Sequence, residues 1–351
     1  MGSKHRFVAR ENSTAKGLKR YQGDNLVKVR LTHIDGKLPN LALMRLSAFH
    51  KGRGDDVYFT SGVERGLMEP EYDRVYGSAI FQYSRGRLDR FMRAWPDAIV
   101  GGTGTSSTRT VEEFAGDFDE MDYSIYPNFK PSMGFTQRGC RLNCDFCCVP
   151  KKEGKNRHVA MIDRIWRGPG HPKKLHLLDN DFFGQQEHKW RSIVQEINDG
   201  KFKVCLNQGI NVRLINDAAA EALASMEYRD DQFQQRRIYT AWDNIGHERI
   251  FFEGMDRLER AGIPARHVMA YMLIGKDPNE THERRMYRFQ KMVDRGILPF
   301  PMVWNRDIKA HREFQRWVVT GLYRRIPFED YRVSYKSAAK DSNAQQLLVL
   351  N

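Results

Sequence analysis

The sequence has few cysteines and no long apolar stretch. Only five of its 351 residues are cysteine, and no apolar run approaches the roughly 20 residues that a membrane span needs. The N-terminal segment is charged and lacks the apolar core that secretory signals carry. These absences argue against a secreted disulfide framework and against a membrane protein. We therefore expect a cytoplasmic protein with no membrane contact.

The length and the pattern of short apolar segments indicate more than one α/β domain. Strand-like segments that end in Gly, Ser or Thr alternate with helical ones. About six such units follow one another in the second half, which fits a partial or complete α/β barrel with functional residues at the strand ends. The expected divisions are a flexible basic arm at 1–25, a first domain at 26–120, a second at 121–305, and a basic helical extension and tail at 306–351.

The net charge of +13 is concentrated near the two ends. Residues 1–30 contain eight Lys or Arg and two acidic residues, and residues 301–340 contain nine and four. Basic ends on a near-neutral body suggest a polyanionic partner, most simply nucleic acid. A solvated tail and an ordinary basic helix would give the same composition. Charge alone leaves both interpretations open.

Four of the five cysteines lie close together, in GCRLNCDFCCVPKK. Cys140, Cys144 and Cys147 have the spacing C-x3-C-x2-C, and thiolates are soft ligands for zinc or iron–sulfur clusters. Structural zinc prefers four ligands, so three cysteines in one loop fit better a four-iron cluster with one iron left open. Taking Cys148 as the third ligand would give C-x3-C-x3-C instead. Cys205 lies in a predicted strand and is expected in the core.

The stretch C-RLN-C-DF-C after a predicted strand resembles the signature of the radical S-adenosylmethionine (SAM) superfamily. In that superfamily a [4Fe-4S] cluster binds SAM at its open iron, and reduction cleaves SAM to a radical that abstracts hydrogen from a substrate. The resemblance implies that Cys140, Cys144 and Cys147 ligate the cluster and that Phe146 lies beside the adenine. It also implies an external one-electron reductant of the flavodoxin or ferredoxin type.

The similarity continues at the ends of later predicted strands. Asp-Asn-Asp also favours a turn, and Arg213 could equally form a surface salt bridge, so each position alone is weak evidence for a ligand contact. A glycine at a strand end allows a nucleoside to approach closely. The resemblance implies SAM or substrate contacts for eight residues, namely Asp179, Asn180, Asp181, Asn207, Gln208, Arg213, Asp243 and Gly275.

The first domain resembles the Rossmann-like cobalamin-binding module that precedes some radical SAM barrels. Modules with a lower-face histidine use D-x-H-x-x-G, and here His33 and Gly36 are present while Leu31 stands in place of the aspartate. The acid that would orient the histidine is therefore absent, and cobalamin is a possible cofactor rather than an implied one. A glycine-rich loop after a later strand is either a ligand loop or a tight turn; it contains Gly101, Gly102 and Gly104.

The sequence thus predicts an α/β protein with a Rossmann-like cobalamin-binding-type domain, a partial (βα)6 radical SAM barrel and a helical C-terminal extension. One hypothesis is modification of a nucleic acid base or nucleotide; another is cobalamin-dependent methylation of a small molecule or peptide. A third is a non-catalytic iron–sulfur protein that binds nucleic acid. Phe314 and Trp317 have helical spacing and are expected in the core. The aromatic residues near the basic C-terminal region that could stack on bases are Trp304, Phe314, Trp317, Tyr323, Tyr331 and Tyr335.

Overall fold

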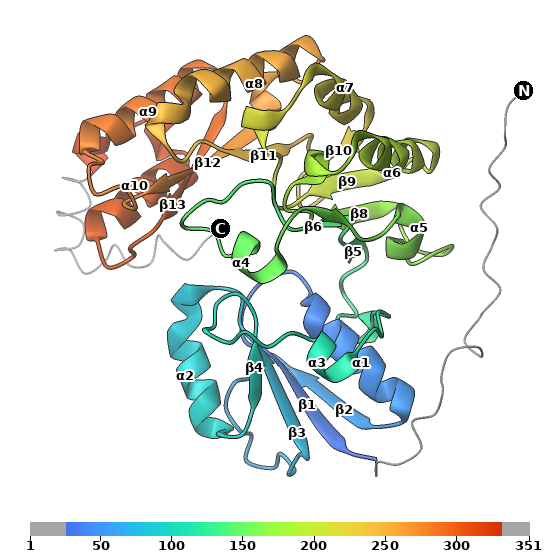
Figure 1. The fold of residues 1–351 in the computed structure, drawn as a ribbon. Coiled ribbons are helices and arrows are strands. Elements are labelled where there is room, and N and C mark those ends of the chain that lie inside the picture. The colour runs from blue at the N-terminus through green and yellow to red at the C-terminus, as the bar shows by residue number, and fades with distance from the viewer. Residues whose placement is uncertain (1–25, 332–351) are drawn as a thin grey trace, which may run out of the picture. The chain divides into compact units, whose positions relative to one another are not determined.

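Parallel strands alternating with helices make the chain a mixed α/β protein (Figure 1). The computed structural model describes residues 26–331; the arm predicted at 1–25, and the tail after 331 with Tyr335, lie outside this range. The chain divides into two units. Unit 1 comprises 1–131 and 167–172, and unit 2 comprises 132–166 and 173–351. Within 26–331, no helix combines the length and apolarity needed to cross a bilayer.

Unit 1 contains a four-stranded parallel sheet in the order β2-β1-β3-β4. Both faces of the sheet carry apolar side chains, with Leu31 and Leu43 in one cluster and Ile34 and Phe91 in another, as expected for a parallel sheet covered on both sides. The elements of this unit are β1 (Lys28–His33), α1 (Leu41–Arg53), β2 (Asp56–Thr60), β3 (Arg74–Ser78), α2 (Arg85–Ala94), β4 (Ile99–Gly101) and α3 (Glu112–Ala115).

Unit 2 contains two parallel sheets, in the orders β10-β9-β8-β5 and β11-β12-β13. The backbone N–H of Ile210 donates to the Tyr239 carbonyl at 2.8 Å, which links the segment after β9 to β11. Apart from β10, the parallel strands therefore follow one another in chain order from β5 to β13. They are β5 (Ser132–Gly134), β8 (Lys174–Leu177), β9 (Lys203–Leu206), β11 (Ile238–Ala241), β12 (Val268–Ile274) and β13 (Leu298–Val303), with the short β10 (Glu227–Tyr228) at one edge.

Helices cover one face of these strands (Figure 1). Along β12 every second residue, beginning at Val268, is buried under them, and the residues between are half-buried. Phe314 and Trp317 are 0% and 3% exposed, which confirms the prediction that they belong to the core. The helices are α6 (Glu187–Asp199), α7 (Asp217–Ser225), α8 (Glu248–Arg260), α9 (His282–Asp294) and α10 (Lys309–Val319).

Among the described residues, β13 is an edge strand of its sheet, and it contains Pro299 and Pro301. Proline has no N–H to donate to a neighbouring strand, so both residues discourage extension of the sheet beyond this edge. Helix α10 borders β13 instead, and Gln315 on α10 donates to the Pro301 carbonyl at 2.8 Å. Helix α10 therefore lies beside the edge of the sheet at β13, where another strand would otherwise pair.

Candidate functional site

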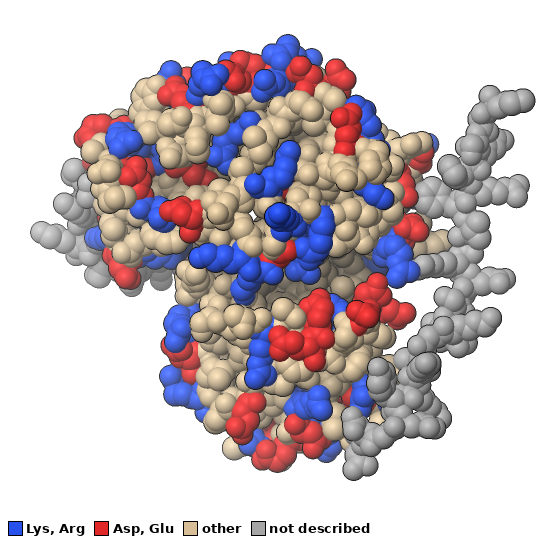
Figure 2. All heavy atoms as spheres, in the orientation of Figure 1, with Lys and Arg blue, Asp and Glu red and all other residues tan. Residues whose placement is uncertain are grey.

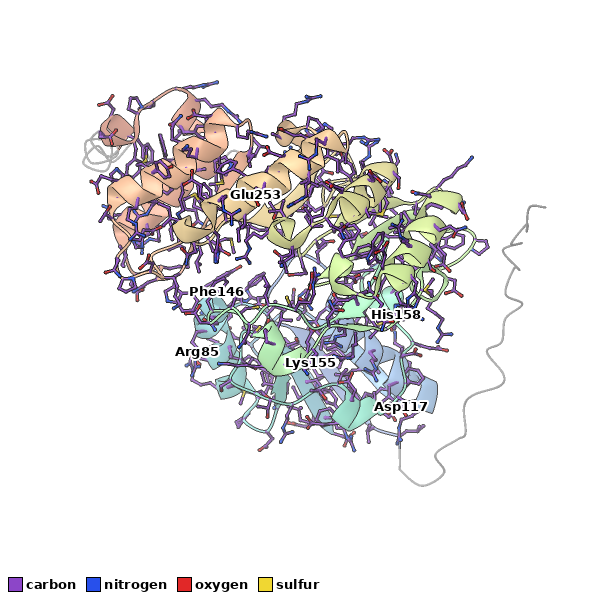
Figure 3. All side chains as sticks on the ribbon, turned by 45° about the horizontal axis from the view of Figure 1, so that its top comes forward. Arg85, Asp117, Phe146, Lys155, His158 and Glu253 are labelled. Atoms are coloured by element: carbon purple, nitrogen blue, oxygen red, sulfur yellow. The ribbon has the colours of Figure 1, made fainter. Side chains whose placement is uncertain are left out.

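The cysteines lie in a loop carried by a small hairpin that follows β5. Strands β6 (Gln137–Arg138) and β7 (Arg157–His158) pair in antiparallel fashion at its base, and the loop includes the short helix α4 (Val149–Glu153). The Cys140 N–H donates to the Gly154 carbonyl at 3.4 Å. Figure 3 labels Phe146, Lys155 and His158 on this segment and Glu253 on the outer helix α8. The loop is thus closed at its base.

Gly139 allows the two ends of the loop to meet. Its φ is +78°, and a Cβ at this position would lie 2.2 Å from the Lys155 carbonyl oxygen. A larger residue would therefore combine left-handed backbone strain with a backbone collision. The residue immediately before Cys140 is consequently restricted to glycine by the closure of the loop.

The three predicted ligands share one environment and the other two cysteines do not. Cys140, Cys144 and Cys147 are half-buried, Cys148 is exposed and Cys205 is buried in β9. The Cys147 N–H donates to the Cys144 carbonyl at 3.0 Å, which forms a tight turn between these two residues. The structure therefore separates Cys148 from its neighbour by exposure.

The surroundings of two of the thiols favour their neutral form. Burial raises the pKa of Cys140 and of Cys147, and nearby thiols and carboxylates act in the same direction. Backbone N–H groups of Leu142 and Val149 oppose this rise by donating to the two sulfur atoms, at 3.4 and 3.5 Å. A bound cation would favour the thiolates, because metal ligation requires deprotonated sulfur. Backbone donors of this kind also accompany cysteine sulfurs in iron–sulfur sites.

Asp181 ties the cysteine loop to the end of β8. Its carboxylate accepts from Arg141 Nε at 2.7 Å, from Arg141 Nη2 at 3.0 Å and from the Arg141 backbone N–H at 3.2 Å. Asn156, on the far side of the loop, donates to the Asp181 carbonyl at 3.1 Å. Asp181 is 1% exposed, so a two-pronged charge-assisted contact holds the residue next to Cys140 in place.

Asn180 and Asp179 hold the same hairpin at two further points. Asn180 Nδ2 donates to Glu153 at 2.8 Å, and Glu153 in turn accepts the Gly139 N–H at 3.0 Å. Asp179 accepts the Thr136 N–H at 2.7 Å and also the Thr136 hydroxyl. The Asp-Asn-Asp triplet therefore uses its side chains to position the cysteine loop. The structure brings these three residues to the cysteine loop, where their side chains contact other parts of the protein.

Burial dominates the electrostatics of Asp179. Its side chain is 2% exposed, and burial raises the pKa of Asp179 to about 7 although the two Thr136 donors act against this rise. A carboxyl group in this position is only partly ionised near neutral pH. The strength of the contact between Asp179 and Thr136 therefore depends on pH.

Several members of this network carry no signal in the sequence. Glu153, Asn156 and Gln137 contact the loop base or the triplet; Gln137 Oε1 accepts the Asp181 N–H at 2.9 Å. All three lie within 25 residues of the cysteines, but nothing in their spacing marks them as partners of a strand end far along the chain.

Figure 2 shows Lys and Arg side chains gathered over the α4 segment, where Arg141, Lys151, Lys152, Lys155 and Arg157 are exposed.

A cavity of about 280 Å³ lies beside the cysteine loop. Phe146, which is 36% exposed, and Asp243 both line it. Asp145 and Lys276, also in the lining, form an ion pair at 2.9 Å. Two of the predicted SAM contacts, from segments about 100 residues apart, therefore meet at one cavity together with charged groups of both signs.

Arg288, which also lines this cavity, organises the neighbouring strand ends. Its guanidinium donates to the carbonyls of Trp242, Asp243 and Leu273 at 2.9, 3.0 and 2.9 Å, and it also contacts Glu280. Arg288 is 3% exposed. Burial raises the pKa of Asp243, which accepts the Leu273 N–H at 2.9 Å. These contacts fix the carboxyl ends of β11 and β12 relative to each other.

The remaining predicted contacts have other partners. Gly275 has φ +75°, and a Cβ there would lie 2.4 Å from the His311 ring, so packing as well as conformation favours glycine. Asn207 Oδ1 contacts His176 Nδ1 at 2.8 Å, and Arg213 contacts His247 Nδ1 at 2.8 Å. Gln208 is exposed. Asn207, Gln208 and Arg213 are not among the residues that line the cavity.

The candidate ligand residues of unit 1 are packed against their own chain. His33 is 8% exposed, its Nδ1 contacts the Tyr126 hydroxyl at 3.2 Å, and its buried Nε2 has no hydrogen-bond partner among residues 26–331. Burial lowers the pKa of His33. A Cβ on Gly36 would lie 3.3 Å from that Nε2. The ring therefore does not point an accessible nitrogen at solvent, as an axial cobalt ligand would have to.

The glycine-rich loop of unit 1 is a close backbone crossing. A Cβ on Gly102, where φ is +103°, would lie 2.1 Å from the Ala79 carbonyl oxygen, and one on Gly104 would lie 2.6 Å from the Phe81 nitrogen. A Cβ on Gly101 would meet nothing nearer than 3.8 Å. Close packing of the backbone is therefore sufficient to explain glycine at positions 102 and 104, and no ligand is required.

In the part of the chain from 26 to 331, no group of three or more His, Cys, Asp or Glu side chains is arranged to hold a metal ion. That finding concerns a single ion, whose ligands converge on one point about 2 Å away. In a four-iron cluster each cysteine binds a different iron.

The chain matches no protein-family model, no curated protein and no solved structure.

Proposed function

We propose that the chain is a radical SAM enzyme in which Cys140, Cys144 and Cys147 bind a [4Fe-4S] cluster with one open iron. The observation that carries this proposal is the position of the cysteine loop. It lies at the carboxyl end of parallel strands, is tethered there by Asp181, and borders a cavity lined by Phe146. A soft three-thiol set beside a pocket is the arrangement that such a cofactor and its nucleoside ligand need.

The strand order supports the same proposal. Six parallel strands that follow one another from β5 to β13, with helices on one face, favour a partial (βα)6 barrel. Ligands bind at the carboxyl ends of strands in such folds, and the cysteine loop, Asp179 to Asp181 and Asp243 all follow strand ends. For unit 1, the order β2-β1-β3-β4 favours a Rossmann-like module.

The donor set fits the proposed cofactor. When bound, the cluster would supply the electron that cleaves SAM, and the resulting radical would abstract hydrogen from a substrate. The protein's part is to hold Cys140 through the Asp181–Arg141 contact and to offer Phe146 as an apolar face at the cavity. Lys276 and Arg284 on the same cavity are basic groups that a carboxylate would meet, and Lys276 also pairs with Asp145 there. An external one-electron reductant of the flavodoxin or ferredoxin type would be the redox partner.

Cobalamin is not needed for this proposal. The buried Nε2 of His33 argues against an axial histidine, so we derive no step through cobalamin. A cobalamin-dependent methylase of a small molecule or peptide would have to bind the cofactor by other groups, and a non-catalytic iron–sulfur protein would not cleave SAM. Our preferred substrate class is a nucleic acid base or nucleotide, supported by the net charge of +13.

Anaerobic reconstitution with iron and sulfide, followed by metal analysis and a SAM-cleavage assay with a chemical reductant, tests the proposal. We expect about four irons per chain and formation of 5′-deoxyadenosine. Cys144→Ala should lose both, whereas the matched variant Cys148→Ala, in the same loop but exposed, should keep both. Bound zinc without iron, or 5′-deoxyadenosine formation that survives Cys144→Ala, would refute it. A parallel sample with added hydroxocobalamin tests the cobalamin-dependent methylase alternative, which requires the protein to retain cobalamin.

A further inference from the structure

Three aromatic side chains form a ladder across the strand face of unit 2 opposite the helices. Tyr239 on β11 and Tyr271 on β12 are stacked, with ring centroids 6.1 Å apart and an interplanar angle of 8°. Tyr271 and Phe300, directly opposite each other on β12 and β13, meet edge to face at 5.6 Å. All three are half-buried, so their rings are partly accessible. Burial raises the pKa of Tyr271 to about 12, which keeps its phenol neutral.

The ladder leads to a basic groove at the edge of the sheet. Phe300 also lines a second cavity, of about 410 Å³, between β13 and α10. Four basic residues line this cavity against one acidic residue, Glu313. They recur every three or four positions, which places them on one side of α10 and the turn before it. They are Arg306, Lys309, Arg312 and Arg316.

From this geometry we infer that the ladder and the groove together bind single-stranded nucleic acid. A positively charged groove that follows the phosphates, next to aromatic rings on which bases stack, is the general design of single-strand binding sites. The chemistry of the groove alone would suit any polyanion; the ladder adds the requirement for planar rings. A duplex keeps its bases stacked on one another and cannot present them to half-buried rings, so a single strand is the better fit.

This inference rests on the proposed function only for the fate of the strand. The ladder lies on the strand face that points away from the helices, in the same unit as the cysteine loop. If the chain is a radical SAM enzyme, the strand is its substrate and a base or its ribose supplies the hydrogen atom. Binding itself requires neither a cluster nor SAM, so the two proposals can fail separately.

Fluorescence anisotropy with the full-length chain, reconstituted with iron and sulfide, tests the inference. Probes are labelled single strands of RNA and DNA, about 20 nucleotides long so that they span a whole site, and the matching duplexes. We expect single strands of at least one type to bind more tightly than their duplex, with an affinity that falls as salt rises. Arg312→Ser/Arg316→Ser should weaken binding about tenfold and reduce the salt slope by roughly 0.7 for each phosphate that is no longer neutralised. Phe300→Leu and Tyr271→Leu should each weaken it about tenfold.

The matched control removes two arginines elsewhere. Arg191→Ser/Arg249→Ser lowers the net charge equally on α6 and α8, where these side chains are 53% and 80% exposed, and should leave affinity within about twofold. Thermal midpoints of all variants identify any that fail to fold, and photocrosslinking of a 4-thiouridine strand to the Phe300 peptide gives a readout independent of mutation. The inference is overturned if no single strand binds, if the control weakens binding as much as the groove variant, or if both ladder variants bind normally.

Discussion

The two units place similar sequence features at the carboxyl ends of parallel strands and use them differently. In unit 1 the Asp35 carboxylate accepts the N–H groups of Ile80 and Phe81 at 2.6 and 2.9 Å, and Gly102 lies against the Ala79 carbonyl. In unit 2 the Asp181 carboxylate is also bound by groups of the protein, but the segment that it holds carries Cys140. The carboxylate closes a loop in one unit and positions a loop of half-buried cysteines in the other.

The difference shows what makes a strand end a candidate site. In both units the polar groups at the strand ends satisfy one another, so an acidic residue at such a position is not by itself a ligand. Unit 2 differs because its tethered loop also contains three half-buried thiols and borders a cavity with charged residues. A site is therefore indicated by groups that remain available after the internal hydrogen bonds are made.

The largest expected effect comes from removing the tether of the cysteine loop. Asp181→Ala leaves Arg141 without its buried partner and should lower the affinity for iron about 10- to 100-fold, as loss of a group that orients metal ligands does. Asp35→Ala removes a comparable carboxylate from unit 1. It should cost about 1–3 kcal/mol of unfolding free energy and leave iron content unchanged. Iron loading by metal analysis and chemical denaturation of both variants measure the contrast; equal iron loading would remove the distinction between the two edges.

The glycine loop of unit 1 gives the next largest effect. Gly168→Ala places a side chain at φ +90° with no atom within 4 Å, so it should cost only the left-handed backbone strain of about 1–2 kcal/mol. Gly102→Ala adds the collision with Ala79 and should cost roughly 1–3 kcal/mol more. Urea unfolding of both variants isolates the packing contribution. Equal costs would mean that the loop can move away, as a ligand-binding loop would.

The last expected effect is a pH dependence at Asp179. The folded protein retains the Asp179 proton up to about pH 7, whereas the unfolded chain releases it near the ordinary pKa of 3.8. The unfolded state thus binds fewer protons in this window, and the Asp179 contribution to stability falls as pH rises through it. The free energy of unfolding of the wild type minus that of Asp179→Asn should decrease by about 3 kcal/mol from about pH 4 to about pH 7. A difference independent of pH would contradict the raised pKa.

The α/β class and the cysteine cluster could be predicted from the sequence because both rest on local patterns. Alternating strand and helix segments indicate parallel sheets, and Cys140, Cys144 and Cys147 are close in sequence. The partners of the loop could not be predicted, because contacts such as Asp181 with Arg141 join segments 40 residues apart. Gly275 and Gly102 stand out in the sequence only by their place at strand ends. The collisions that restrict them, with His311 and Ala79, depend on packing that no short pattern encodes.

The proposed cluster has an open iron that binds SAM, and electron paramagnetic resonance of the reduced, reconstituted protein reports on that iron. We expect a signal from a reduced [4Fe-4S] cluster whose spectrum changes when SAM is added, in the wild type and in Cys148→Ala, and no such signal in Cys147→Ala. A cluster signal that SAM leaves unchanged, or one that persists in Cys147→Ala, would contradict it.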